Sequence, residues 1–207
     1  MTGRYVAERS LGVFGSAFNP PHLAHLIFLA EAKWQLGLDR LIVVPTGDPY
    51  HKKIDSDPGA EVRFRLAEAA FGGKDGIEVS SIELRREGPS YTCDTLEEIA
   101  DPLGKYETHL LMGADAAKGF AGWRSPERIL ELVRIGIAVR PGTGREEVEP
   151  VFESLGAADR VEYFEMPQVD ISSSMIRRRI GAEEPFRHLV PTKVAQMIEN
   201  GDTYGTE

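Results

Sequence analysis

The sequence predicts an α/β protein with a single doubly wound parallel β-sheet and helices on both faces. Short apolar segments alternate along the chain with longer amphipathic segments, which is the pattern of consecutive strand and helix units. The 207 residues suffice for one such domain and are too few for two large ones. With 42% hydrophobic and 28% charged residues, the composition is typical of an ordinary globular protein.

Six strands are predicted from short runs of aliphatic and aromatic residues, at positions 11–14, 40–44, 77–82, 109–112, 135–139 and 161–164. Apolar residues at helical spacing predict helices at 21–36, 61–70, 91–100 and 125–132, and a closing helix at 190–199. We expect one domain over residues 1–207, with a small helical segment from about residue 170. Because Trp34 continues the helical spacing of Leu26, Leu29 and Ala30, we expect it in the core.

The first strand leads into the most informative segment of the chain, Gly12-Val-Phe-Gly15-Ser-Ala-Phe-Asn-Pro-Pro-His22-Leu-Ala-His25. Gly15 allows a tight turn after the strand, and Pro20-Pro21 is predicted to occupy the first turn of a helix. The unpaired amides at such a helix start favour an anion. His22 and His25 stand three residues apart on one helical face, where both rings reach the same group. The segment therefore predicts a phosphate site.

Two other interpretations of this segment are disfavoured. Paired metal-binding histidines on a helix more often stand four residues apart with a carboxylate between them, as in His-Glu-x-x-His, and no such carboxylate is present. The glycine-rich loops of other nucleotide-binding proteins differ as well, because neither a Walker lysine nor a complete Gly-x-Gly-x-x-Gly follows the strand. We therefore expect the pair to bind phosphate and no metal ion.

Ligands of a doubly wound sheet bind beyond the carboxyl ends of its strands, so the loops that follow the other strands are informative. The loop after the second strand contains His51-Lys52. Lys52 can bring a mobile positive charge to phosphate oxygens and His51 a directional donor, although a solvated basic loop is the alternative. The length and the prolines of residues 45–58 also make this loop a candidate lid.

The blocks after the third and fourth strands carry polar and aromatic residues. In Gly88-Pro-Ser90-Tyr91-Thr92, the Gly-Pro pair makes a turn, and either Ser90 or Thr92 can cap the following helix. Asp115, just past the fourth strand, suits a hydrogen bond to a ribose hydroxyl. Trp123 offers an aromatic face to a ring, with ordinary packing as the alternative.

Two further blocks add positive charge and helix-start donors. Arg140 closes the fifth strand in Arg-Pro-Gly, where it suits either a phosphate contact or a structural ion pair. In Asp170-Ile-Ser172-Ser-Ser-Met-Ile-Arg177, Ser172 can cap a helix whose first amides and hydroxyls face phosphate. Arg177, one turn on, reaches the same oxygens.

Charge and cysteine content narrow the class of protein. A formal net charge of -9 argues against broad nucleic-acid binding, which needs a basic face. A single cysteine, Cys93, excludes an internal disulfide, fits a reducing compartment and is expected to be chemically inert. No apolar run approaches the roughly 20 residues needed to span a bilayer, and the first ten residues lack the apolar core of a signal peptide. We therefore expect a cytoplasmic location.

Taken in order, these blocks resemble the motifs of the nicotinate-nucleotide adenylyltransferase family of nucleotidyltransferases. The first segment is similar to the family pattern GxFGGTFDPxHxGH and departs from it at Ser16, Ala17, Asn19 and Ala24. The later blocks resemble the family's His-Lys loop, its Gly-Pro-Ser-Tyr-Thr block, its Gly-x-Asp and Phe-x-x-Trp pattern, its Arg-Pro-Gly and its Ile-Ser-Ser-Thr-x-Ile-Arg signature. The resemblance covers most of the chain and implies a Rossmann-like fold.

The resemblance implies transfer of AMP from ATP to nicotinate mononucleotide, giving nicotinate adenine dinucleotide and pyrophosphate in NAD biosynthesis. The mononucleotide's own phosphate would attack the α-phosphorus, so that the enzyme needs no covalent nucleophile. Catalysis would rest on alignment and charge stabilisation. Mg²⁺ is expected to arrive with ATP, with no protein residue assigned to it. No nucleic-acid or membrane partner is expected, and a homo-oligomer stays open.

The resemblance also assigns residues to roles. The catalytic set is His25, His22, Lys52 and Arg177. The ATP-binding set is Gly12, Phe14, Gly15, Ser16, Ala17, Phe18, His22, His25, Ile171, Ser172, Ser173, Ser174 and Arg177. The set for the pyridine nucleotide is His51, Lys52, Tyr91, Thr92, Asp115, Trp123, Arg124 and Arg140. Arg124 stands where the family often has an aromatic residue, and its charge favours a carboxylated ring.

Three alternatives stay open at this point. The first is a related adenylyltransferase that prefers nicotinamide mononucleotide or acts on phosphopantetheine. The second is a non-catalytic nucleotide sensor on the same fold, for which Ala24, in place of the family's glycine, is the only indication. The third is an RNA-linked protein, because class I aminoacyl-tRNA synthetases share a His-x-Gly-His motif; the short, acidic chain argues against it.

Overall fold

A computed structural model describes residues 9–49, 54–103, 106–139, 144–201 and 203–204. Six strands form one parallel sheet in the order β3-β2-β1-β4-β5-β6. The strands are β1 (Arg9–Ser16), β2 (Arg40–Pro45), β3 (Ile77–Val79), β4 (Tyr106–Gly113), β5 (Arg134–Val139) and β6 (Val161–Glu165). All six predicted strands are confirmed, although β3 ends three residues before the predicted end and β4 is longer at both ends.

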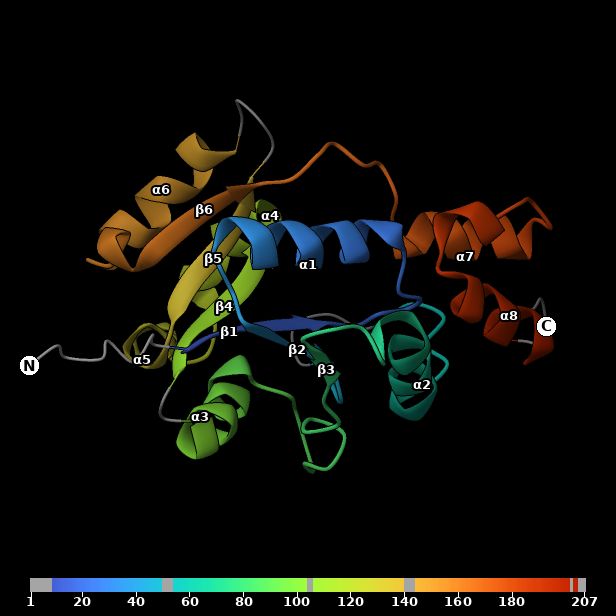
Figure 1. Ribbon diagram of the computed structural model, residues 1–207, viewed down its shortest axis with the longest axis horizontal. Helices are drawn as coiled ribbons and strands as arrows, with labels where there is room; N and C mark the ends of the chain where they lie inside the picture. The colour runs from blue at the N-terminus through green and yellow to red at the C-terminus, as the bar shows by residue number, and fades with distance from the viewer. Residues whose placement is uncertain (1–8, 50–53, 104–105, 140–143, 202, 205–207) are drawn as a thin grey trace, which may run out of the picture.

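The helices that connect the strands are α1 (Leu23–Gln35), α2 (Ala60–Phe71), α3 (Thr92–Leu103), α4 (Ala114–Lys118), α5 (Pro126–Leu132), α6 (Arg145–Ser154), α7 (Ser173–Gly181) and α8 (Thr192–Asn200). Short 3-10 turns lie at η1 (Phe120–Gly122), η2 (Ala158–Arg160) and η3 (Arg187–Leu189). None of the described helices is long and apolar enough to cross a membrane. The chain runs from the sheet to α7 and α8, which lie together beyond its carboxyl edge (Figure 1).

Two apolar clusters lie on opposite faces of the sheet, which confirms the doubly wound arrangement. The first joins the strands to α3, α4, α5 and α6 through residues such as Leu96, Ile129 and Phe152. The second joins them to α1, α2, α7 and α8 through residues such as Phe28 and Leu66. Because both faces of the strands are buried, the strands read as nearly continuous apolar runs, and this is why the sequence predicts them well.

The order of the strands indicates where on the sheet a ligand would bind. The chain winds outward from β1 to β3 on one side and from β4 to β6 on the other, so that β1 and β4 are neighbours at the point where the winding reverses. At such a point the loops after the two central strands diverge and leave a crevice for a ligand. The loops after β1 and β4 are those that carry the two histidines, Asp115 and Trp123.

The structure corrects two details of the β1 to α1 connection. Gly15 lies within β1, and the turn follows the strand at Phe18, which has a left-handed φ of 51°. Pro20 and Pro21 precede α1, which begins at Leu23 with His22 as its N-cap, and the Asn19–Pro20 peptide is cis. The strand extends because Gly15 and Ser16 continue the pairing with β2.

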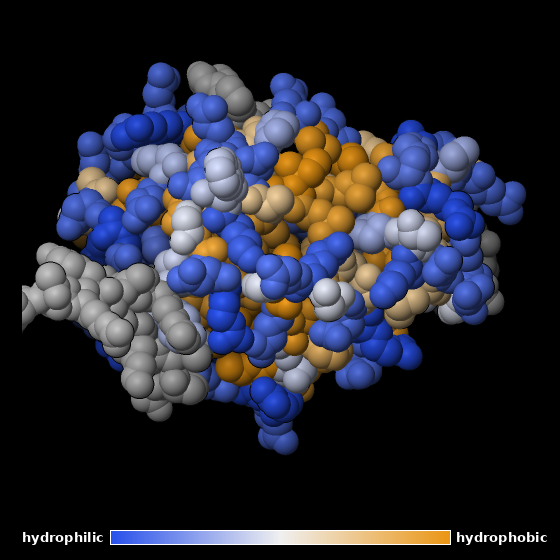
Figure 2. Space-filling model, in the orientation of Figure 1, coloured by the Kyte–Doolittle hydropathy of each residue, from blue (hydrophilic) through white to orange (hydrophobic). Residues whose placement is uncertain are grey.

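The prediction for Trp34 is wrong, since this side chain is 83% exposed. The buried face of α1 follows Phe28, Leu29 and Ala32. Trp34 stands two residues after Ala32, about 200° around the helix axis, and therefore faces away from the sheet. Figure 2 shows apolar side chains at the surface in the region of α1, where Ile27 is half-buried and Ala30 is exposed.

Candidate active site

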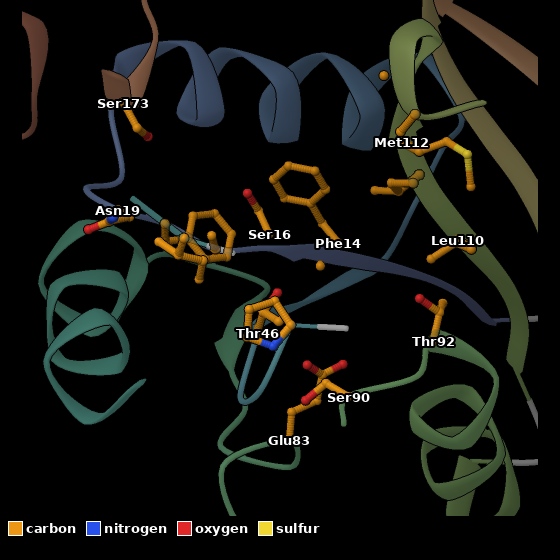
Figure 3. A pocket seen from close by; sticks show the side chains of 18 of the residues that line it. Phe14, Ser16, Asn19, Thr46, Glu83, Ser90, Thr92, Leu110, Met112 and Ser173 are labelled. Atoms are coloured by element: carbon orange, nitrogen blue, oxygen red, sulfur yellow. The ribbon is translucent and has the colours of Figure 1, made fainter. Parts of the chain in front are cut away.

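The carboxyl ends of β1 and β4 open into a cavity of about 520 Å³. Phe14 and Ser16 project from β1 toward α1, whereas Thr46 and Ser90 lie on the other side of the strand (Figure 3). The residues that line the cavity come from strands β1 and β4, from the loops between elements and from helices α3, α4 and α7: Phe14, Gly15, Ser16, Ala17, Phe18, Asn19, Thr46, Pro49, Ile54, Asp55, Glu83, Ser90, Thr92, Leu110, Leu111, Met112, Gly113, Ala116, Trp123, Ser173, Ser174 and Arg177. The predicted residues at the two ends of the chain are thus brought to one site.

The two histidines are stacked at the start of α1. Their ring centroids are 3.8 Å apart, and the rings are inclined by 25°. The backbone amide of His22 donates to Nδ1 of His25 at 3.1 Å. Because Nδ1 accepts this bond, the proton of a neutral His25 ring resides on Nε2, which is then a hydrogen-bond donor. The ring of His25 lies 5.1 Å from that of Phe18, which lines the cavity.

Both imidazoles are neutral near pH 7. Burial lowers the pKa of His22 from its ordinary value of 6.5 to about 4. Burial, and then repulsion from His22, lower the pKa of His25 well below 6.5. Within the described part of the chain, Nδ1 of His22 is buried and has no hydrogen-bond partner. The pair therefore presents neutral hydrogen-bonding groups, and neither ring is a fixed positive charge.

The start of α7 lines the cavity beside the loop that leads into α1. The hydroxyl of Ser172 accepts a hydrogen bond from the amide of Met175 and caps the helix, as predicted. Ser173 donates its hydroxyl to the carbonyl of Pro20 at 2.8 Å. Arg177 donates from Nη1 to the carbonyl of Asn19 at 2.8 Å and from Nη2 to the Ser174 hydroxyl at 3.4 Å. These contacts join segments more than 150 residues apart and direct hydroxyl and guanidinium groups at one space.

The other end of the cavity is aromatic. Trp123 lines it and packs against Phe120, with ring centroids 5.4 Å apart. Thr92, the first residue of α3, also lines the cavity. The guanidinium carbon of Arg124 lies 4.1 Å from the centre of the Tyr91 ring, and its Nη1 lies 3.9 Å from a carboxylate oxygen of Asp94. This end thus offers an aromatic face, a hydroxyl and a nearby positive charge.

A second hollow of about 430 Å³ adjoins the first and shares Gly113 with it. Its lining combines small and apolar residues with three charged side chains: Phe28, Gly113, Ala114, Asp115, Lys118, Ala138, Val139, Gly144, Glu147, Met166 and Val169. Phe28 stacks on Phe14 of the first cavity at 4.4 Å between centroids. Asp115 is therefore placed in the second hollow, apart from Thr92 and Trp123, with which the sequence grouped it.

Comparisons with known proteins show the family to which this chain belongs. The model of the cytidylyltransferase-like family matches residues 13–179. A protein of Dehalococcoides mccartyi named "probable nicotinate-nucleotide adenylyltransferase" is 35% identical over 195 residues, which are 93% of this chain and 96% of that protein. The chain belongs to the nicotinate-nucleotide adenylyltransferases within the cytidylyltransferase-like family. A relative of the same name from Carboxydothermus hydrogenoformans is 35% identical over 201 residues, which are 96% of this chain and all of that protein.

Solved structures support the fold of this adenylyltransferase. The nicotinic acid mononucleotide adenylyltransferase of Plasmodium falciparum, complexed with NaAD, matches with a TM-score of 0.74 over 95% of this chain and 97% of that one. The same protein complexed with APC matches with a TM-score of 0.72. At 16% identity these likenesses establish the Rossmann-like fold and no more.

Several predicted site residues of this enzyme lie elsewhere than expected or outside the structure. His51, Lys52 and Arg140 lie outside the described residues. Gly12 lies in the middle of β1 and makes room for packing, because a Cβ there would lie 2.7 Å from a methyl carbon of Leu41. Ile171 packs against the second apolar cluster and does not line either hollow as described.

The structure also places three other residues that the sequence analysis discussed. Ser90 does not cap α3, since its hydroxyl instead accepts a hydrogen bond from the amide of Asp48 at 3.1 Å. Ala24 is buried in the first turn of α1. Cys93 is buried in the first apolar cluster, and burial is the main cause that raises the pKa of its thiol, which agrees with an inert side chain.

One buried residue of the site was missed altogether. Arg63 of α2 is 1% exposed, and it hydrogen-bonds to carbonyls of two loops that line the cavity. A signal was present in the sequence, because position 63 falls on the same helical face as Leu66, Ala67 and Ala70, which are buried. A charged residue on an apolar face requires buried partners, and such partners cannot be identified from local sequence.

Proposed function

We propose that this protein catalyses transfer of AMP from ATP to nicotinate mononucleotide, forming nicotinate adenine dinucleotide and pyrophosphate for NAD biosynthesis in the cytoplasm. The observation that carries this assignment is the pair of adjoining hollows that share Gly113. Phe18, which contacts the His25 ring, lines the first hollow, and Phe28, one turn further along α1, lines the second. A dinucleotide has two such halves and a phosphate bridge between them.

Each hollow suits one half of the product. The apolar side chains of the second hollow, among them Phe28 and Val139, fit an adenine ring, and the Asp115 carboxylate in its lining can accept a hydrogen bond from a ribose hydroxyl. The first cavity fits the mononucleotide, whose pyridine ring would lie on Trp123. Its phosphate would then point toward the start of α1. The positive charge of Arg124 beside Tyr91 favours the carboxylated ring over the amide.

The reaction needs alignment more than it needs a protein nucleophile. A phosphate oxygen of the mononucleotide attacks the α-phosphorus of ATP, and the bond from that phosphorus to the oxygen of the β-phosphate breaks, releasing pyrophosphate. Nε2–H of His25 donates to an α-phosphate oxygen as negative charge develops on it. The hydroxyl of Ser174 and the guanidinium of Arg177 hold the departing phosphates, whereas the Ser173 hydroxyl already donates to the Pro20 carbonyl.

Mg²⁺ is proposed to arrive bound to ATP. Two carboxylates line the first cavity, Asp55 and Glu83. Glu83 already accepts hydrogen bonds from the Gly47 amide and the Thr95 hydroxyl. The described residues include no group of three or more His, Cys, Asp or Glu side chains arranged to hold an ion. On the triphosphate, the ion screens the repulsion between the two anionic reactants.

Side-by-side turnover tests this function. The purified protein is mixed with ATP, Mg²⁺ and either nicotinate mononucleotide, nicotinamide mononucleotide or phosphopantetheine, and pyrophosphate release is measured. We expect the acid mononucleotide to give the highest kcat/KM. A higher value with the amide or with phosphopantetheine would transfer the assignment to that acceptor. Absence of pyrophosphate with all three would indicate a nucleotide sensor.

A further inference from the structure

Arg63 is the largest fully buried side chain in the described part of the chain. It lies on α2, on the face that packs through Leu66, Ala67 and Phe71 against the second apolar cluster. A guanidinium stays charged at all physiological pH values, so its burial is tolerated only where carbonyl or carboxylate groups receive its hydrogen bonds. The identity of those groups shows what the buried charge holds together.

The guanidinium of Arg63 contacts three separate loops. Nη1 donates to the carbonyl of Ala17, in the loop after β1, at 3.2 Å, and to the carbonyl of Thr46, after β2, at 2.5 Å. Nη2 donates to the carbonyl of Gly47 at 3.1 Å. Nε donates to Oδ1 of Asp57, in the segment that leads into α2, at 2.8 Å. The planar fork of the guanidinium fixes the distances among these loops.

The same loops form walls of the substrate cavity. Ala17 and Thr46, whose carbonyls accept from Arg63, both line it. Asp55, two residues before Asp57, lines it as well. Arg63 itself is not among the lining residues that the structure describes. Its influence on a bound nucleotide therefore passes through the backbone of the loops it holds.

A second set of contacts joins the same loops independently. The side-chain amide of Asn19 donates to the carbonyl of Asp55 at 3.0 Å, and the hydroxyl of Tyr204 donates to Oδ1 of Asn19 at 2.7 Å. These bonds keep the loop after β1 near the segment before α2 when the Arg63 contacts are weakened. A change at Arg63 is thus expected to displace the loops by a fraction of their spacing and to leave the fold in place.

We propose that Arg63 is a positioning residue for adenylyl transfer, which sets the spacing of the loops after β1 and β2 and of the segment before α2 around the mononucleotide. This proposal rests on the proposed function. Reacting groups misplaced by about 1 Å react on the order of 100-fold more slowly. A small displacement of the loops, after loss of the three carbonyl contacts, is therefore expected to lower the rate. No contact between Arg63 and a substrate is required.

Matched lysine substitutions on α2 test the proposal. Arg63→Lys keeps a positive charge near Asp57 but cannot reach three carbonyls at once from a single ammonium group. Arg65→Lys makes the same change at an exposed position two residues away. For Arg63→Lys we expect kcat/KM for the mononucleotide to fall by roughly 10- to 100-fold, with a normal circular dichroism spectrum. For Arg65→Lys we expect values within about twofold of wild type.

Hydrogen exchange supplies a readout that does not depend on turnover. In Arg63→Lys we expect faster amide exchange in residues 16–19, 46–49 and 54–57, and unchanged exchange in β4 and β5. Wild-type kinetic constants together with a lowered Tm would overturn the proposal, because Arg63 would then serve stability alone. Unchanged exchange in the three segments would overturn it too.

If Arg63→Lys does not fold, a milder variant tests the proposal. Asp57→Ala removes the acceptor for Nε of Arg63, and with it the contact to the segment before α2, and leaves the carbonyl contacts of Arg63 in place. A raised KM for the mononucleotide in this variant, with a normal spectrum, supports the proposal, and an unchanged KM overturns it. If wild-type protein releases no pyrophosphate, the proposed function fails, and the exchange measurement still shows whether Arg63 fixes the loops.

Discussion

His25 is the residue on which the proposed chemistry most depends. Its Nδ1 accepts the amide proton of His22, so Nε2 carries the ring proton and can donate to the α-phosphate. We expect His25→Ala to lower kcat by about 10²- to 10³-fold, as removal of one donor to developing charge does elsewhere. Because the mononucleotide is proposed to bind at the other end of the cavity, around Trp123, its KM should change much less. Steady-state kinetics with each substrate varied in turn measures both effects.

Three further variants separate the role of Nε2 from a general loss of packing. His25→Gln places an amide donor near the position of Nε2 and should retain part of the lost rate, whereas His25→Asn, which is too short, should not. His188→Ala, at an exposed histidine of η3, should behave as wild type. Equal losses in kcat and in mononucleotide affinity would remove His25 from the transition state.

The buried ring of His22 makes stability depend on pH. Its pKa is about 4 in the folded protein and near 6.5 when unfolded, so the unfolded state takes up a proton first as pH falls. Above pH 6.5 the group contributes nothing, and between pH 6.5 and about 4 it destabilises the fold by up to about 3 kcal/mol. His22→Asn should therefore lose less stability than wild type between pH 7.5 and 4.5.

Urea unfolding at those two pH values measures this difference, with His188→Asn as the control because His188 is exposed. The control should retain the pH dependence of wild type. If His22→Asn retained it as well, the imidazole of His22 would not be the group that burial keeps neutral.

Individual site residues could be predicted where the reason for them is local. Ser172 caps α7 through an amide three residues away, and a cap of this kind is visible in any short window of sequence. The contacts of Ser173 to Pro20 and of Arg177 to Asn19 span 153 and 158 residues, so they depend on the complete fold. Arg63 was missed for the same reason, because its partners lie 16, 17 and 46 residues away on other loops.

At the scale of elements, strands were easier to predict than helices. A parallel strand buried on both faces needs apolar residues at every position, and β2 and β5 show this pattern. Helix α6 was missed, because Pro150 lies inside it and few of its residues, including Val148 and Phe152, are buried. In α1 the spacing was recognised but the buried face was chosen wrongly, because an amphipathic pattern that includes Trp34 fits more than one orientation.

The start of α1 determines how the two histidines of the first motif are positioned. The sequence placed Pro20 and Pro21 inside α1, whereas the helix begins only at Leu23. The two prolines therefore extend the loop after β1. This delay puts His22 at the N-cap, with an extended backbone, and His25 one turn inside the helix. With this backbone the two rings stack, their centroids 3.8 Å apart.

At the scale of the molecule, the order of the strands determines where the hollows proposed for the two substrates lie. Neighbouring β1 and β4 end beside each other, with the two hollows on either side of Gly113. The sequence could predict a doubly wound sheet, but it grouped Asp115 with Trp123 because they stand only eight positions apart. In the structure the two side chains line different hollows.

This separation predicts independent effects on the two substrates. Asp115→Ala removes a charged acceptor for a ribose hydroxyl and should raise KM for ATP by about tenfold, with KM for the mononucleotide unchanged. Trp123→Leu removes the aromatic face but keeps apolar volume, and should raise KM for the mononucleotide by about tenfold with KM for ATP unchanged. Each variant is the control for the other. If the product fills both hollows as proposed, its binding free energy, measured by titration calorimetry, should weaken in the double variant by the sum of the two single effects. A variant that raised both KM values equally, or a sum that failed by more than about 0.5 kcal/mol, would show that the two hollows bind as one.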